Sequence, residues 1–462
     1  MMRTRNAGQA LPLGLFFMLG SAVVMYFMFN SGRVVDEKLR ITNAADSAAY
    51  SVAVLEARAL NFDAYSNRAI VANQVAIAQA VSLASWIHYF GTGVDNADAL
   101  ADVASSWIYD PEEYPRLASL VAAFGGTAYL DHVTGGVTDG AVRVLDEGLA
   151  AIVSAHDLVS QALSQSQSII HTALSAGAAQ RTLANEIVHR IDPAMSAELI
   201  VTGHGFDAFT KAYRKDDPDG DGRGRLAETV LRSRDAFTAE RRWSIDGPDI
   251  WPLQRNVELK RRGGTDLINY DEWRAIDTLE HQGQRLRKGS WRWRRTSLAW
   301  GAAEADSDDG ASGTGFHGGT YADNRRTTKM YAEPSMLDLD ELGARFSGLP
   351  TTRDLARLEP SQSARTGVSL RVSKPGGSLR MSGGNSVVQP SGRLRQFNAA
   401  PPGEEMAALS RAEVFFDRID ERRDGGREYP SLYSPYWEVR LVSPTADDRA
   451  WAAARQEGAL LP

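Results

Sequence analysis

Residues 10–29 read ALPLGLFFMLGSAVVMYFMF and contain no charged side chain. At ~1.5 Å of rise per residue, a helix of this length spans the ~30 Å hydrocarbon core of a bilayer. The stretch therefore predicts a membrane helix near the N-terminus, with the rest of the chain following this anchor. The apolar side chains that would face lipid or a helical assembly are Leu11, Leu13, Leu15, Phe16, Phe17, Leu19, Val23, Val24 and Phe27.

The flanks of this stretch orient it only moderately. Arg3 and Arg5 precede it, and a short basic head before a first span favours an N-terminus inside the cell and export of the remainder. A cleaved secretory signal and a buried helix of a soluble protein are the alternatives. Signal peptides have a shorter apolar region, about 7–15 residues, that ends at small side chains. This stretch is longer and ends in Met28-Phe29-Asn30, which favours a retained anchor.

The chain as a whole has the composition of a soluble protein. Of the 462 residues, 43% are hydrophobic and 24% charged, so most of the chain is ordinary globular protein with two or three domains. The formal charge of −7 disfavours nucleic acid as a partner. The absence of cysteine excludes disulfides, thiolate zinc sites and cysteine nucleophiles.

A long helix is predicted to continue directly from the membrane segment. Residues 33–90 contain neither proline nor glycine and are rich in alanine, so nothing in the sequence ends the helix there. Small apolar side chains recur every three or four residues and form a narrow stripe that permits close packing. They are Ile41, Ala45, Ala48, Val52, Leu55, Ala59 and Phe62.

The N-terminal region resembles a known family. Its short basic leader, its single apolar helix and the run NAADSAAY at residues 43–50 are similar to TadE/TadG-like proteins of the tight-adherence (Tad, or Flp) pilus system. The run ALNFDAYSNRA at 59–69 resembles a long-helix subgroup of these proteins, and YPSLYSPYW at 429–437 does so more weakly. The resemblance implies a pilin-like protein of the bacterial inner membrane with a single pass. Its bulk would be periplasmic, or extracellular as part of a pilus, and its partners would be other pilin or pilus-assembly subunits and inner-membrane lipid.

Gly8 and Gln9 would flank a processing site if the leader were cut as in type IV pilins. The fifth residue after Gly8 is Leu13, where type IV pilins carry glutamate. This departure counts against cleavage by a prepilin peptidase.

A second long helix is predicted from residue 139 to residue 190, packed on the first as a hairpin. Side chains there recur at steps of four and three, the 3.5-residue period of helix pairs. His156 and Ser166 interrupt this seam as structural polar positions, and the isolated pair Glu186 and His189 has the spacing of metal ligands without further support. The seam consists of Leu145, Leu149, Ile152, His156, Val159, Leu163, Ser166, Ile170 and Ala173.

The second half of the chain is predicted to be β-rich. After Trp243, short alternating segments are punctuated by glycine pairs. Residues 257–260 and 266–270 would form a hairpin around Gly263-Gly264, and residues 368–372 and 378–381 a hairpin around residues 374–377.

The predicted fold class is therefore α+β: a membrane helix that continues into a long pilin-like helix, a helical hairpin or bundle, and a β-rich C-terminal head. The predicted segments are 1–30 (leader and membrane helix), 31–90 (stalk helix), 91–242 (helical region), 243–444 (exported β-rich domain) and 445–462 (C-terminal tail).

One local motif predicts Ca²⁺ as a ligand. Residues 217–228 read DPDGDGRGRLAE, with carboxylates at positions 1, 3 and 5, glycine at 6 and glutamate at 12 of an EF-hand loop. Gly224 and Arg225 at positions 8 and 9 depart from that pattern, and a solvated acidic turn is the alternative. The predicted ligands are Asp217, Asp219, Asp221, the backbone carbonyl of Arg223, and Glu228.

Basic and aromatic residues interleave over 285–295. This combination suits single-stranded nucleic acid, an anionic polysaccharide or a lipid headgroup. Alternation in a strand places Trp291, Trp293 and Arg295 on one face and Arg292 and Arg294 on the other, which favours an ordinary half-buried strand. The basic residues are Arg285, Arg287, Lys288, Arg292, Arg294 and Arg295.

Catalytic signatures are missing from the sequence. It has no phosphate-binding loop, no G-x-S-x-G elbow and no H-E-x-x-H zinc helix, and His204, His281 and His317 have no partner nearby in sequence. We therefore predict a non-enzymatic minor pilin-like component of a Tad/Flp pilus, located at its tip or acting in its assembly. A membrane-tethered, calcium-dependent adhesin is the alternative, and an exported hydrolase would need a cleft of perturbed carboxylates or histidines that the sequence does not display.

Overall fold

The computed structural model describes residues 10–107, 111–175, 177–200, 206–213, 221–249, 251–307, 330–356, 364–380, 405–418, 422–426 and 428–458. The chain forms two compact units. Unit 1 comprises Met1–Tyr65, Ser168–Lys211 and Asp354–Pro462, and unit 2 comprises Ser66–Gln167 and Ala212–Arg353. The two units alternate along the chain, so each is assembled from segments that are distant in sequence.

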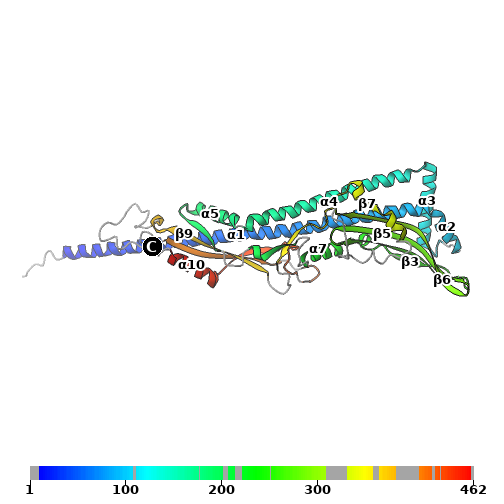
Figure 1. Ribbon diagram of the computed structural model, residues 1–462. Coiled ribbons are helices and arrows are strands. Elements are labelled where there is room, and N and C mark those ends of the chain that lie inside the picture. Colours follow the sequence, from blue (N-terminus) through cyan, green and yellow to red (C-terminus); the bar gives the residue numbers. More distant parts are fainter. Residues whose placement is uncertain are drawn as a thin grey trace, which may run out of the picture. The chain divides into compact units, whose positions relative to one another are not determined.

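The N-terminal helix α1 runs without interruption from Ala10 to Asp95, which confirms the predicted continuation of the membrane segment (Figure 1). Its 86 residues correspond to about 130 Å of helix. The helix continues past Gly91 and Gly93, because single glycines weaken a helix by only ~1 kcal/mol. At Gly93 the missing side chain leaves room for the ring of Phe124, which would lie 2.5 Å from a Cβ there.

Unit 1 packs helices on a four-stranded antiparallel sheet. The strand order is β1-β9-β10-β11, with bounds Ser196–Ile200, Arg365–Pro375, Glu405–Phe416 and Trp437–Val442. Helix α5 (Ala178–Ile191) precedes β1, and helix α10 (Ala446–Gly458) follows β11. The short helix α6 (Phe206–Phe209) is followed by strand β2 (Thr210–Tyr213). Strand β2 pairs with β8 (Thr352–Leu355) in a separate two-stranded sheet.

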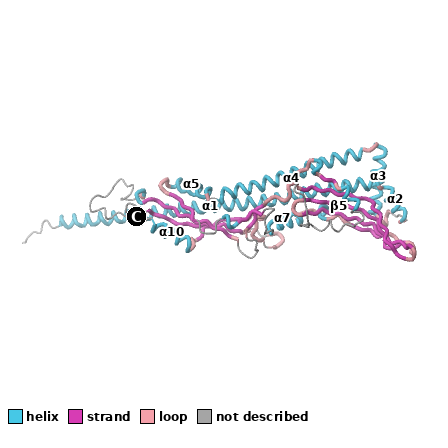
Figure 2. The backbone as a smooth tube through the Cα atoms, in the orientation of Figure 1, coloured by secondary structure: helices cyan, strands magenta, loops and turns pink. Residues whose placement is uncertain are grey.

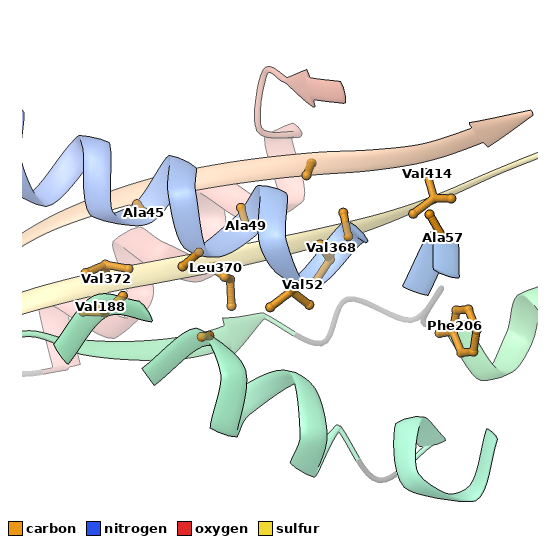
Figure 3. Close-up of a cluster of buried hydrophobic side chains, with 14 of the residues drawn as sticks. Ala45, Ala49, Val52, Ala57, Val188, Phe206, Val368, Leu370, Val372 and Val414 are labelled. Atoms are coloured by element: carbon orange, nitrogen blue, oxygen red, sulfur yellow. The ribbon is translucent and has the colours of Figure 1, made fainter. Parts of the chain in front are cut away.

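The small-residue stripe of α1 forms the core of unit 1. Ala45, Ala49 and Val52 lie beside the β9 side chains Leu370 and Val372 (Figure 3). Alanine lets the helix approach the strands closely, while the branched β9 residues fill the space between them. The predicted stripe is confirmed: Ile41, Ala45, Ala48, Val52 and Ala59 are buried, and Leu55 and Phe62 are half-buried.

Unit 2 contains a five-stranded sheet of order β3-β4-β5-β6-β7, antiparallel except for the β6–β7 pair. The strand bounds are Trp243–Asp246, Gln254–Ile268, Glu272–Arg287, Ser290–Asp306 and Leu337–Asp338. The helices are α2 (Ala97–Ser106), α3 (Pro115–Thr134), most of α4 (Val137–Ser175), α7 (Asp221–Arg232) and α8 (Ala236–Ala239). Unit 2 also contains 3₁₀ turns at Glu333–Ser335 and Asp340–Leu342, and a further 3₁₀ turn at Gly376–Ser378 belongs to unit 1.

Helix α1 touches the sheet of unit 2 directly at Gly301 on β6. A Cβ at this position would lie 2.2 Å from both the carbonyl oxygen of Ser85 and the backbone nitrogen of Tyr89. Ser85 Oγ donates a hydrogen bond of 2.8 Å to Asp277 Oδ2 beside this contact. Only glycine therefore allows the helix backbone and the strand backbone to meet here.

The second long helix differs from the prediction in two respects. It is split into α4 and α5 at Gly177, whose φ of 63° lies in the left-handed region that ends helices. The buried face of α4 is also shifted by one residue from most of the predicted seam positions. Leu145, Ile152 and Val159, which were predicted to be buried, are exposed. The buried residues are Asp146, Leu149, Ala150, Val153, Asp157, Ser160, Gln167, His171 and Leu174.

Both predicted hairpins are wrong. Strand β4 continues straight through Gly263, because a Cβ there would lie 2.3 Å from Asp277 Oδ1 and the glycine makes room for that buried carboxylate. The turn of this hairpin lies instead at Asn269 and Tyr270, both with positive φ. Strand β9 ends in a 3₁₀ turn and pairs with β1 and β10, not with residues 378–380; Met381 lies outside the described residues. The α+β class is nonetheless confirmed, with helices and strands in both units (Figure 2).

Candidate functional site

The apolar start of α1 is largely exposed. Among the described residues, α1 is the one helix long and apolar enough to cross a membrane, and none of its most apolar window is buried. Leu11 is 79% exposed and Phe16 76%. This exposure contradicts the alternative of a buried helix in a soluble protein, because a core helix would cover these side chains. Of the predicted apolar residues, Val23 is half-buried and the other eight are exposed, whereas Gly8 and Gln9 lie outside the described residues.

A buried ionic cluster lies where α1 leaves this exposed segment. Lys374 Nζ on β9 lies 2.9 Å from Glu37 Oε2 on α1 and 2.8 Å from Asp192 Oδ2 at the end of α5. The side chains of Lys374 and Glu37 are 1% and 0% exposed. Arg40 and Arg380 surround the cluster, since both guanidinium groups lie 3.8–4.0 Å from carboxylate oxygens of Glu37 and Asp192.

This cluster fastens three elements of unit 1 to one another. Burial opposes ionisation of Asp192, but hydrogen bonds from Lys374 and from the backbone of Ala194 lower the pKa of this carboxyl below its ordinary value. A buried charge is tolerated only with such partners. Glu37 and Lys374 are 337 positions apart in the sequence, and nothing in the sequence indicated that they meet.

The run ALNFDAYSNRA on α1 binds segments from the far end of the chain. Asn61 Nδ2 donates to the carbonyl oxygen of Trp437 at 3.0 Å, and the Trp437 backbone N–H donates to Asn61 Oδ1 at 3.1 Å. Asp63 lies 2.6 Å from His171 Nε2, and both are buried. The ring of Phe206 stacks on His171 with centroids 5.1 Å apart. Two runs that carry the family resemblance, 59–69 and 429–437, are therefore joined by hydrogen bonds between the Asn61 side chain and the Trp437 backbone.

The same run continues the pattern within unit 2. Asn67 Nδ2 donates to the carbonyl oxygen of Arg353 at 2.8 Å. Gln167 on α4 donates to Asn67 Oδ1 at 2.8 Å and to Ser66 Oγ at 2.6 Å, and accepts from the Arg353 backbone N–H at 3.1 Å. Buried amides whose donors and acceptors are all engaged fix one register between helices. The polar residues of the run are thus structural, which the resemblance alone did not reveal.

Four histidines of the described chain, His88, His156, His171 and His281, have hydrogen-bond partners. His88 Nε2 lies 2.9 Å from Asp146, and His156 Nδ1 lies 2.7 Å from Asn73 Oδ1. Burial and the nearby Arg285 and Arg294 lower the pKa of His281 to about 4. His156 thus has a structural role, as predicted. Among the remaining candidates, Glu186 forms an ion pair with Arg190, and His204 and His317 lie outside the described residues.

Three carboxylates that the sequence did not single out converge beside β7. Asp306, Asp338 and Asp340 each place an oxygen within 4.8 Å of the others. Their oxygens are of the type that divalent cations bind, and they also repel one another. Burial and a hydrogen bond with Asp306 raise the pKa of Asp340 to about 8. Burial, together with the Glu304 and Asp306 charges, raises the pKa of Glu272 to about 7, against the opposing effect of Arg274.

The stability of the protein is expected to fall as pH rises from about 4 to about 8, because of these raised pKa values. The folded state keeps protons that the unfolded carboxyls have released in this range, so folding takes up protons and is disfavoured as pH increases. Asp340→Asn should flatten the dependence of the melting temperature on pH, whereas Asp98→Asn, a change at an exposed carboxylate, should leave it unchanged. An Asp340→Asn protein with the wild-type pH profile would contradict the assignment.

The predicted calcium loop is described only in part. Asp217 and Asp219 lie outside the described residues, and nothing is described for the side chains of Asp221 and Arg223. Helix α7 begins at Asp221, and Glu228 is exposed and forms an ion pair with Arg232. The Ca²⁺ site therefore stays a prediction.

Comparison with known proteins bears on the N-terminus. Residues 8–55 match a family model described as Flp pilus-assembly TadE/G-like, which covers about a tenth of the chain. No curated protein and no solved structure matches the chain. The matched segment contains the exposed apolar part of α1, Glu37 and the first five residues of the small-residue stripe. Residues 8–55 are thus similar to the TadE/G-like Flp pilus-assembly family, as the resemblance indicated.

Proposed function

We propose that this protein is a non-enzymatic structural or assembly component of a Tad/Flp-type pilus, held in the inner membrane by the start of α1, with the rest of the chain exported. One observation carries the proposal: the segment matched to the pilus-assembly family contains an apolar helix surface that the protein itself leaves uncovered. Beyond that segment, three of the described histidines and the buried lysine of β9 are engaged in structural contacts.

The physical mechanism is transfer of one helix surface between two apolar environments. From residue 14 to residue 29 the backbone N–H and C=O groups are bonded within the helix, so lipid and the core of a helical fibre satisfy them equally well. Moving from one to the other requires no new hydrogen bond. The partners are therefore lipid before assembly and the apolar helices of other pilin or pilus-assembly subunits afterwards.

A minor or tip-located position suits the large folded part of the chain. A shaft subunit must repeat identical contacts with its neighbours at every step of the fibre. Two compact units that together contain most of 462 residues would have to be accommodated at each of those steps. A low-copy or terminal position avoids that requirement, and imaging that found this chain at every shaft position would contradict it.

The test is deletion of the gene followed by complementation. We expect deletion to abolish pili and the wild-type chain to restore them. A chain carrying Leu19→Arg with Val24→Arg should not restore them, because each arginine at the centre of a span costs ~2.5–3.5 kcal/mol of insertion free energy. The control, Leu19→Phe with Val24→Leu, should insert and complement.

Membrane insertion is measured by alkaline extraction, and pili are counted by electron microscopy. Intact pili with lost surface attachment after deletion would favour the adhesin alternative over a pilus component. A native product that is freely soluble and lacks its first thirty residues would overturn the membrane anchor itself.

A further inference from the structure

The closed end of the β5–β6 hairpin carries large apolar side chains that the protein leaves uncovered. Trp251 is 73% exposed and Leu253 68%, on the segment that leads into β4. Trp293 is 50% exposed and Leu286 45%, on β6 and β5. The predicted alternation of Trp291 and Trp293 against the arginines is confirmed, but the strand is more open than the expected half-buried one.

The aromatic side chains on one face of the hairpin are held in place by stacking and cation–π contacts. Trp251 and Trp291 stack with ring centroids 5.7 Å apart, and the guanidinium of Arg255 lies 4.3 Å from the centroid of the Trp291 ring. Cross-strand pairing places Leu286 opposite Trp291, and Gln284 opposite Trp293. The tryptophans are therefore held in position while their outer surfaces, with the two leucines, remain open.

The other face is strongly cationic. Residues 283–297 contain no aspartate or glutamate, and alternation places Arg285, Arg287, Arg292 and Arg294 on one face. Arg285 lies directly opposite Arg292 in the register, and like charges at such a pair are destabilising. In the described part of the chain, none of Arg287, Arg292 and Arg294 forms a salt bridge. Burial, together with the charges of Arg285 and Arg294, lowers the pKa of His281. An anionic partner would reduce the repulsion between these positive charges.

We propose that this end of the hairpin, defined by Trp251, Leu253, Leu286, Trp293 and the four arginines, docks on an anionic lipid surface. Tryptophan is the side chain most suited to the headgroup region of a bilayer. The arginines on the other face of the same hairpin end extend their charge to lipid phosphates while their apolar stems stay near the surface. The exposed leucines decide between partners, because a polysaccharide or a nucleic acid would engage the arginines and the rings but leave Leu253 and Leu286 in water. The inference is independent of membership in a pilus.

The test uses the full chain in nanodiscs of phosphatidylcholine, so that the apolar part of α1 is already in neutral lipid. These particles are mixed with dense vesicles that contain phosphatidylglycerol, or with vesicles of phosphatidylcholine alone, and sedimented. We expect binding to the anionic vesicles only. Arg287→Gln with Arg292→Gln and Arg294→Gln should weaken binding on the order of 100-fold, which corresponds to ~1 kcal/mol for each cation.

Two further variants separate the causes. Leu286→Ser with Trp293→Ser keeps every charge and should still weaken binding about tenfold, with the loss persisting in high salt. The control, Arg116→Gln with Arg143→Gln and Arg242→Gln, removes three exposed arginines elsewhere in unit 2 and should bind as the wild type does. Melting curves of each variant verify folding.

Three results would overturn the inference. The first is equal binding to neutral and anionic vesicles, and the second is an equal loss in the control variant. The third is a protein that does not bind vesicles but is retained on heparin or single-stranded DNA, with the Leu286→Ser/Trp293→Ser variant retained equally well. That result would assign the surface to a polyanion instead.

Discussion

Lys374→Met is expected to lower the free energy of unfolding of unit 1 by about 3–5 kcal/mol. The change preserves the length and volume of the side chain but leaves Glu37 and Asp192 without the ammonium group that lies 2.8–2.9 Å from both. Glu37 is fully buried, so water cannot replace that partner. Hydrogen exchange of the β9 amides, followed by mass spectrometry in detergent, measures the loss where the strand meets α1.

The matched control is Lys260→Met, which breaks the Lys260–Glu258 ion pair of unit 2. That pair has the same 2.9 Å separation, but its side chains are 26% and 22% exposed. Exposed pairs contribute about 0–1 kcal/mol, so the control should be nearly neutral. Adding Glu37→Leu to Lys374→Met should recover part of the lost stability, because an apolar pair needs no counter-charge. Equal effects of Lys374→Met and Lys260→Met would show that the cluster is open to water.

Sequence reasoning succeeded where a single chemical property decides the structure. The absence of charge over residues 10–29 and of proline and glycine over residues 33–90 was enough to predict α1. The alanine stripe also predicted the packed face of α1, because small size and helical spacing can both be read directly.

It failed where polar side chains form the buried surface. The seam of α4 was assigned one residue out of register because apolar periodicity favoured Leu145, Ile152 and Val159, whereas Asp146, Val153 and Ser160 are buried. Their polar members are tolerated because α1 supplies partners, as His88 does for Asp146. Such pairing between distant residues leaves no periodic signal.

Long-range convergence explains the other missed features. Asp306 meets Asp338 and Asp340 only because β7 pairs in parallel with the end of β6. Lys374 reaches Glu37 across 337 positions of sequence. Gly263 was read as a turn, since glycine breaks strands, but its function is to leave space for Asp277 on the neighbouring strand. A single sequence records these residues but not their neighbours.

Gly301→Ala is expected to destabilise unit 2 by more than the ~1–3 kcal/mol of an ordinary overpacked core position. The added methyl carbon would lie 2.2 Å from the Ser85 carbonyl oxygen and the Tyr89 nitrogen, both in the backbone of α1. A side chain could rotate away, but a helix backbone can only move as a whole. That movement would also break the hydrogen bond from Ser85 to Asp277 and the contact between the hydroxyls of Ser82 and Thr265.

Gly283→Ala on β5 provides the matched control for this glycine. Its added methyl would lie 3.5 Å from Val257 Cγ2, an ordinary contact distance, within the same sheet. This change should be neutral or slightly stabilising, because alanine reduces the freedom of the unfolded chain. We expect Gly301→Ala, but not Gly283→Ala, to lower the melting temperature and to expose the amides of residues 82–92 and of β6 to hydrogen exchange. Wild-type protection of those amides in Gly301→Ala would mean that α1 does not rest on the sheet at this glycine.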